Sequence, residues 1–189
     1  MPLTTLDPKI ALIIVDLQKG VAAMAPPAAF ETVVKHSRAL ADAFRERKLP
    51  VVLVTVDGVA PGRTDEPRRH MGAFPDGFSD LVPELRTQPS DILVTKRTWG
   101  AFATTDLEQQ LKALGVTQVV VTGVATGSGV EATARQAYEA GFNVTLALDA
   151  MTDTRPGAHD HSIANVFPRI SETGTTDDIL ILLGKGALT

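Results

Sequence analysis

The chain has 189 residues, which is ample for one hydrophobic core and short for two, so a single domain over residues 1–189 is expected. With 44% hydrophobic and 21% charged residues, a net charge of −4 and only short apolar runs, the composition argues against a nucleic-acid partner and against a membrane protein. The sequence has no cysteine, which excludes disulfides, thiolate metal ligands and a thiol nucleophile, and it begins without a signal-peptide pattern, so we expect a cytoplasmic protein.

Short apolar runs alternate with amphipathic stretches along the whole chain. In chain order they predict strand Ile10–Asp16, helix Phe30–Arg47, strand Leu49–Val56, strand Ile92–Thr95, helix Thr104–Leu114, strand Gln118–Thr122, helix Gly127–Ala140, strand Asn143–Leu148, helix Pro156–Phe167, strand Ile170–Thr173 and helix Thr175–Leu183. Gly115 and Gly141 are the expected stops of two helices, and Thr175 with Asp178 three residues later is a helix-start signal.

Apolar strands that alternate with helices are typical of an α/β fold. We therefore expect a doubly wound, mostly parallel six-stranded sheet with helices on both faces. The segment Gly58–Pro89 is an exception to the short connections elsewhere. Connections of that length are usually functional lids or partner contacts, and this one is expected to lie near an interface.

In doubly wound sheets the ligand lies beyond the carboxyl ends of the strands, so the residues there are site candidates. Asp16 follows the first strand and leads to Gln18, Asp57 follows the second, Lys96 the third and Asp149 the fifth. Burial could raise the pKa of the Asp16 carboxyl toward acid–base use, or Asp16 could serve as a cap or ion-pair partner. Lys96 could hold Asp16 ionised, bind an anionic substrate or form a structural ion pair.

The fourth predicted strand leads into a glycine-rich turn, Gly123–Gly129, at the start of a helix. Glycines let the backbone approach a ligand, and free N–H groups at a helix start suit a carboxylate or a developing oxyanion. The turn matches neither the phosphate P-loop nor the dinucleotide fingerprint. A tight turn without a ligand is the alternative interpretation.

Three segments together resemble the isochorismatase-like, or cysteine hydrolase, superfamily. They are Ile13–Gln18 (IIVDLQ), Val94–Phe102 (VTKRTWGAF) and Val121–Ala134 (VTGVATGSGVEATA), and the similarity extends to Asp149–Met151 and Glu172–Thr175. The resemblance implies a Rossmann-like three-layer fold and a homodimer or larger oligomer. It also implies a non-proline cis peptide bond, which would fall at Val124–Ala125.

Amidases of this family use an Asp-Lys-Cys triad, and Asp16 and Lys96 match its first two members. Gly129 occupies the cysteine position, so the thiol mechanism is absent here. Ser128 is adjacent, but one residue along a helix points about 100° away, which makes it a poor replacement nucleophile. Family members that cleave isochorismate can also lack the thiol, because hydrolysis of a vinyl ether needs an acid to protonate carbon. Asp16 is the candidate acid.

The resemblance further suggests residues that contact the substrate. The candidates beyond Asp16, Lys96 and Gly129 are Gln18, Trp99, Val124, Ala125 and Ser128. Trp99 could instead be buried filling or an interface anchor. Three arginines of the long segment could bind substrate carboxylates, although solvated surface charge is the preferred interpretation: Arg63, Arg68 and Arg69.

No metal or other cofactor is expected. Some family amidases bind a metal through an Asp-x-His pair after the second strand, but Asp57 is followed two residues later by Val59. By default all four histidines are expected at the surface: His36, His70, His159 and His161. The sequence thus favours a small-molecule hydrolase, with a binding module that lost its nucleophile as the alternative from another class, and serine-based amide hydrolysis as a third.

Overall fold

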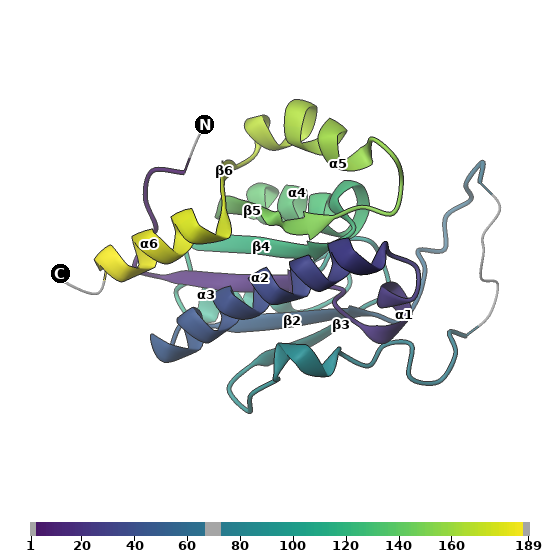
Figure 1. The fold of residues 1–189 in the computed structure, drawn as a ribbon, viewed down its shortest axis with the longest axis horizontal. Helices are drawn as coiled ribbons and strands as arrows, with labels where there is room; N and C mark the ends of the chain where they lie inside the picture. Colours follow the sequence, from purple (N-terminus) through teal and green to yellow (C-terminus); the bar gives the residue numbers. More distant parts are fainter. Residues whose placement is uncertain (1–2, 67–72, 187–189) are drawn as a thin grey trace.

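The computed structural model describes residues 3–66 and 73–186 (Figure 1). Its centre is a six-stranded sheet in the order β3-β2-β1-β4-β5-β6, and every pair of neighbouring strands is parallel. The strands are β1 (Ile10–Val15), β2 (Val51–Val56), β3 (Ile92–Lys96), β4 (Gln118–Val124), β5 (Asn143–Thr152) and β6 (Glu172–Gly174). The predicted fold class is confirmed, and the sheet is parallel throughout.

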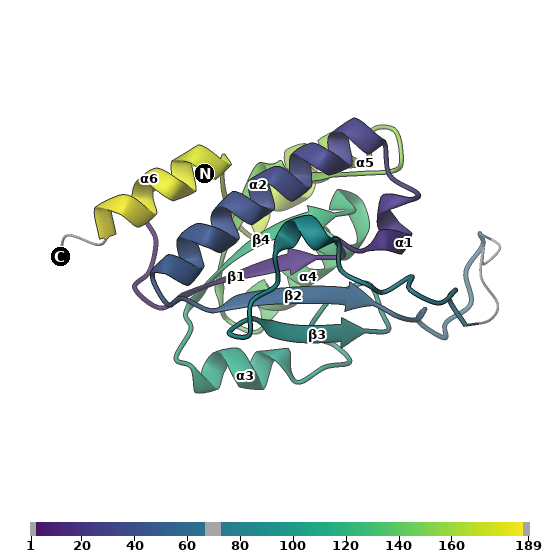
Figure 2. The same cartoon turned by 60° about the horizontal axis from the view of Figure 1, so that its bottom comes forward.

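Helices cover both faces of the sheet, as Figures 1 and 2 show. One apolar core lies between the sheet and helices α2 and α6, and a second lies between the sheet and helices α3 and α4. The helices are α1 (Lys19–Ala22), α2 (Pro27–Glu46), α3 (Leu107–Ala113), α4 (Glu131–Glu139), α5 (Ala158–His161) and α6 (Thr176–Gly186). Because β1 is buried on both faces, all six of its residues can be apolar.

The predicted stop signals of α3 and α4 and the predicted start signal of α6 are confirmed. Gly115 and Gly141 both have a positive φ after α3 and α4, which glycine adopts without steric cost. Before α6, the Thr175 N–H and hydroxyl donate to the Asp178 carboxylate, and the Asp178 N–H donates back to the Thr175 hydroxyl. This reciprocal pair is a capping box.

Apart from shifts in the bounds of several elements, four details differ from the predictions. The short helix α1 was not expected, and α4 is preceded by a wide π-type turn, η2 (Thr126–Val130). The helix predicted after β5 is broken into α5, a second π-type turn η3 (Ser162–Val166) and a 3₁₀ turn η4 (Phe167–Arg169). The long segment contains a 3₁₀ turn, η1 (Pro83–Leu85).

The strand order reverses at the middle of the sheet. From β1 the chain adds β2 and β3 on one side, then returns to add β4 on the other side of β1. Ligands of doubly wound proteins bind where the order reverses, beyond the carboxyl ends of the strands. In this sheet the order reverses between β1 and β4, and the carboxyl ends of these two strands lie beside α1 (Figures 1 and 2). In the described part of the chain, no helix is long and apolar enough to cross a membrane.

Candidate active site

Asp16 lies where β1 ends, at the reversal of strand order. Its backbone has a φ of 55°, a left-handed conformation that aspartate tolerates better than most residues, and its N–H donates to the Val54 carbonyl of β2. The residue is only 5% exposed. The first strand therefore delivers a carboxylate into the protein rather than onto its surface.

Lys96, the last residue of β3, reaches across β2 to this carboxylate. Its Nζ lies 2.7 Å from Asp16 Oδ2 and 3.3 Å from the Thr98 carbonyl oxygen, and the residue is 1% exposed. The ion pair joins strands that are not neighbours in the sheet. Two charged groups that are both buried are tolerated because they neutralise and hydrogen-bond each other.

The two oxygens of the Asp16 carboxyl have different surroundings. Oδ2 accepts from Lys96, whereas Oδ1 is buried and has no hydrogen-bond partner in the described part of the chain. Burial raises the pKa of Asp16 to about 6, against the opposing effect of Lys96, which lowers it. An acid with this pKa can carry a proton near neutral pH, and the proton belongs on Oδ1 because Oδ2 is already an acceptor.

Gly129 lies directly against Asp16. A Cβ atom at this position would lie 3.1 Å from Asp16 Oδ2, 3.2 Å from a methyl carbon of Val15 and 3.4 Å from the Val124 carbonyl oxygen. A side chain here would therefore force its neighbours to move by a few tenths of an ångström. Asp16, Lys96 and Gly129 thus meet in one place, as the strand-end argument predicts.

At position 123 glycine is required by a different constraint, the close approach of β4 to β1. Gly123 has a φ of 121° at an irregularity in the pairing of β4 with β5, and a Cβ atom would lie 2.0 Å from the Val15 carbonyl oxygen. Only glycine fits such an approach of β4 to β1. The peptide bond that ends β4, Val124–Ala125, is cis, as the resemblance implies.

The segment after β3 is hydrogen-bonded to α4, the helix that follows the glycine-rich turn. The Ala101 N–H donates to the Thr133 hydroxyl, and that hydroxyl donates to the Gly129 carbonyl at 2.7 Å. These contacts join the segment that carries Lys96 to the turn that carries Gly129. They explain in part how residues from β3 and β4 reach one site although two strands separate them.

The Gln18 side chain is enclosed by the protein and hydrogen-bonded to backbone groups. Its Nε2 donates to the Val56 and Phe78 carbonyls, and its Oε1 accepts from the Val56 N–H at 2.7 Å. The side chain is fully buried, and both of its N–H donors are used. This geometry favours a role in holding the long segment against β2 over the direct substrate contact that we predicted.

The other predicted contact residues lie around the same edge. Val124 is buried at the end of β4, and Ala125 and Ser128 are half-buried in the turn. The Ser128 N–H donates to the Ala125 carbonyl. Trp99 is 60% exposed, which rules out the buried-filling interpretation and leaves a pocket wall or an interface anchor.

Asp149 is not at this edge. Because β5 runs on to Thr152, Asp149 lies within the strand, where its Oδ1 accepts from the N–H and hydroxyl of Thr176. Asp57 and Arg63 are exposed. Arg68 and Arg69 lie outside the described residues.

Two of the four histidines are less exposed than the default surface assignment expects. His36 and His159 are half-buried and bonded: His36 Nδ1 lies 2.8 Å from the Asp149 carbonyl oxygen, and His159 Nδ1 lies 2.9 Å from the Thr126 hydroxyl. His161 is exposed, and His70 lies outside the described residues. Residues 3–66 and 73–186 contain no group of three or more histidine or carboxylate side chains that could hold a metal ion.

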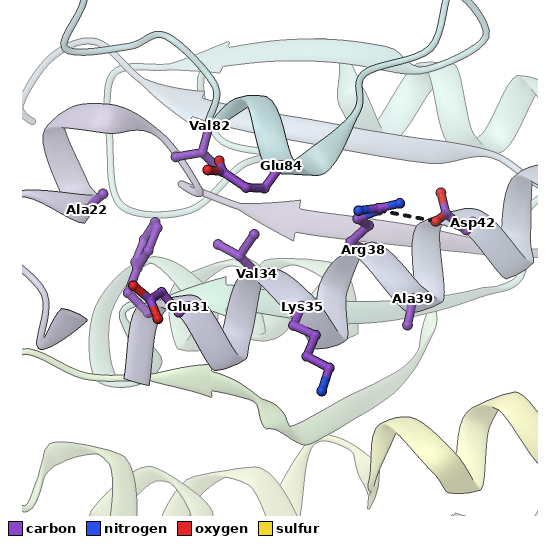
Figure 3. Close-up of a pocket in the computed structure, with 10 residues that line it drawn as sticks. Ala22, Glu31, Val34, Lys35, Arg38, Ala39, Asp42, Val82 and Glu84 are labelled. Carbon is purple, nitrogen blue, oxygen red and sulfur yellow. Dashed lines mark hydrogen bonds and ion pairs between the residues drawn. The ribbon is translucent and has the colours of Figure 1, made fainter. Parts of the chain in front are cut away.

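A cavity of about 580 Å³ lies away from Asp16. Figure 3 shows Val34 of α2 facing Val82 and Glu84, and Phe30 also lines the cavity. It is large enough for a small ligand. We place the candidate site at Asp16 nonetheless, because the buried ion pair and the reversal of strand order coincide there.

Comparison with known proteins places this geometry in context. Residues 10–178 match the isochorismatase domain. The isochorismatase family protein YwoC of Bacillus subtilis is 38% identical over 179 residues, which are 91% of this chain and 93% of YwoC. The structure of an isochorismatase family protein from Burkholderia thailandensis has a TM-score of 0.90 and 37% identity, covering 95% of this chain and 98% of that one. Nicotinamidase 3 of Arabidopsis thaliana is 28% identical over 166 residues, which are 82% of this chain and 79% of that protein.

Proposed function

Because the chain belongs to the isochorismatase family, we propose that it hydrolyses a small molecule without a thiol nucleophile, with Asp16 as general acid and Lys96 as its charge partner. The substrate class that suits this chemistry is a vinyl ether. The family comparison alone does not choose the bond that is cleaved, because the matching domain is named for an isochorismatase and one relative for a nicotinamidase.

The observation that carries the proposal is the Asp16 carboxyl group. Its Oδ1 has no protein donor, its Oδ2 is held by Lys96, and burial raises its pKa to about 6. A carboxyl that only stabilised the fold would be expected to satisfy both oxygens when buried. A general acid needs one oxygen that can hold a proton and release it to a substrate.

The proposed reaction begins with transfer of the Oδ1 proton to the terminal vinyl carbon. Water then adds to the resulting oxocarbenium carbon and gives its proton to the Asp16 carboxylate. The hemiketal breaks to a ketone and an alcohol, so the acid is restored and water is consumed. Because Oδ1 is covered in this structure, a substrate reaches it only when a neighbouring segment or side chain moves.

The test is a substrate screen with distinct products. Isochorismate serves as the vinyl ether, with pyruvate release followed through lactate dehydrogenase; nicotinamide serves as the amide, with ammonia release; a nitrophenyl ester completes the set. We expect turnover of the vinyl ether alone. Turnover of the amide in place of the vinyl ether would overturn the proposal, and saturable binding of isochorismate without any product would indicate a binding protein.

The pH dependence of the reaction should report Asp16. The reactive form is the neutral acid, and burial holds its pKa at about 6 in the folded protein, so kcat/KM should be level below pH 6 and fall above it. The fall should approach about tenfold per pH unit, since one proton is lost. A rate that rises with pH through this range would mean that the carboxylate acts as a base.

Ser128 provides the matched test of a serine nucleophile. Ser128→Ala should change kcat/KM for the vinyl ether by less than about threefold, because water rather than the hydroxyl attacks. Steady-state kinetics of this variant beside wild type decide the point. Loss of nearly all turnover in Ser128→Ala, with Asp16→Asn still active, would instead support the serine mechanism.

A further inference from the structure

The turn that carries Gly129 is bonded to a second segment, the one that follows β5. The Gly127 N–H donates to Asp153 Oδ2 at 2.6 Å, and the Thr126 hydroxyl lies 2.9 Å from His159 Nδ1. The Asp153 side chain is itself oriented, because its Oδ1 accepts from the Arg155 N–H at 2.9 Å. Two polar side chains thus hold two consecutive residues of η2.

Packing reinforces these hydrogen bonds. A Cβ atom at Gly127 would lie 3.3 Å from both Ala158 Cβ and Asp153 Oδ2, and 3.5 Å from Ser162 Oγ. The Ser162 hydroxyl also donates to Glu131 Oε2, at the first residue of α4, at 2.6 Å. The turn therefore has little room to move toward the segment that follows β5.

We infer that Asp153 and His159 are positioning residues that act through η2 to keep Gly129 packed against the Asp16 carboxyl. Gly129 is two residues beyond Gly127 in the same turn, and its Cα carries no side chain that could anchor it. Burial of Asp16 by this turn is part of what keeps water from the carboxyl. The inference rests on the proposed function for its effect on turnover, but not for its effect on Asp16 itself.

A merely structural role is the competing interpretation. Asp153 places a negative charge at the start of η2, the turn that leads into α4, and such a charge stabilises a helix start whatever the site does. Each residue therefore needs a pair of variants, one that keeps a polar atom in place and one that removes it. Asp153→Asn keeps an acceptor for the Gly127 N–H, and His159→Asn keeps a polar atom near the position of Nδ1. Asp153→Ala and His159→Ala remove these groups.

The first readout is the pKa of Asp16, measured by carbon NMR titration of its carboxyl in the free protein. Burial is the main cause of the raised pKa, so a loosened turn that admits water should lower it. We expect a decrease of about one pH unit in both alanine variants and little change in both asparagine variants. His161→Ala, at an exposed histidine two residues from His159, is the matched control and should leave this pKa unchanged.

The second readout is kcat on the vinyl ether, which should fall about 10- to 100-fold in the alanine variants with KM nearly constant. Alanine variants that lower only the melting temperature, with the Asp16 pKa and kcat unaltered, would overturn the inference. If an alanine variant fails to fold, Thr126→Val removes the same hydrogen bond as His159→Ala from the other side. Should wild type turn over no vinyl ether while the pKa of Asp16 still shifts, the proposed function fails and the positioning role stands.

Discussion

Asp16→Asn should lower kcat/KM on the vinyl ether by about 10²- to 10⁴-fold, the range that general acid catalysis typically contributes. Asparagine keeps the shape of the side chain, and its carbonyl can still accept from Lys96. It cannot release a proton from the position of Oδ1, which is the oxygen without a protein partner. Steady-state kinetics at pH 5.5, where most wild-type Asp16 is protonated, give the largest contrast.

Asp80→Asn is the matched control for this substitution. Asp80 pairs with Lys19 at the surface, and both side chains are more than half exposed. Its loss should leave kcat/KM within about twofold of wild type, because exposed ion pairs contribute little. If Asp16→Asn kept near-normal turnover while Asp80→Asn behaved as expected, Asp16 would not be the acid.

The fold could be predicted from the sequence because the strands are buried on both faces. Strand β1 is a continuous apolar run, and β2 and β4 are each built around a run of buried apolar residues, while the stretches that form helices have the period of a helix. The boundaries of β5 could not be predicted in the same way. Its apolar run stops at Asp149, yet the strand continues to Thr152, with the Asp149 carboxylate accepting from the N–H and hydroxyl of Thr176.

The convergence of Asp16 with Lys96 was also predictable, since parallel strands end at one edge. The unequal surroundings of the two Asp16 oxygens were not, because they depend on atoms rather than on sequence spacing. The contacts of Asp153 and His159 were missed for a related reason. They join residues 26 and 33 positions apart; Asp153 belongs to no motif that we singled out, and the predicted helix that contains His159 does not indicate which residue its side chain contacts.

The glycine-rich turn shows where a composition signal was interpreted too simply. Its glycines suggested approach of the backbone to a ligand, with a tight turn without a ligand as the alternative. In the structure Gly123 fits the contact of β4 with β1, Gly127 fits the segment after β5, and Gly129 fits Asp16. Three separate packing constraints therefore produce one sequence pattern, and only the constraint at Gly129 involves a proposed catalytic group.

Lys96→Met should destabilise the protein by about 3–5 kcal/mol at pH 8, the usual cost of removing one partner of a buried ion pair. Methionine fills a similar volume but leaves the Asp16 carboxylate buried without a cation. Lys96 lowers the pKa of Asp16, so its removal should raise that pKa further above 6. Lys19→Met, which removes only the exposed pair with Asp80, is the control and should cost less than about 1 kcal/mol at any pH.

The stability lost in Lys96→Met should be small at low pH and grow as the pH rises. A carboxyl whose folded-state pKa is raised loses stability as the pH rises from the unfolded value of 3.8 through the folded value. At pH 5 Asp16 is mostly protonated in both folded proteins, so the variant should then be nearly as stable as wild type. Above pH 6 wild-type Asp16 ionises beside Lys96. In the variant the buried Asp16 carboxyl must either stay protonated or ionise without a cation beside it, and both states cost stability. Urea unfolding at pH 5, 6.5 and 8 measures the difference; an equal loss of stability at all three pH values would mean that Lys96 contributes packing alone.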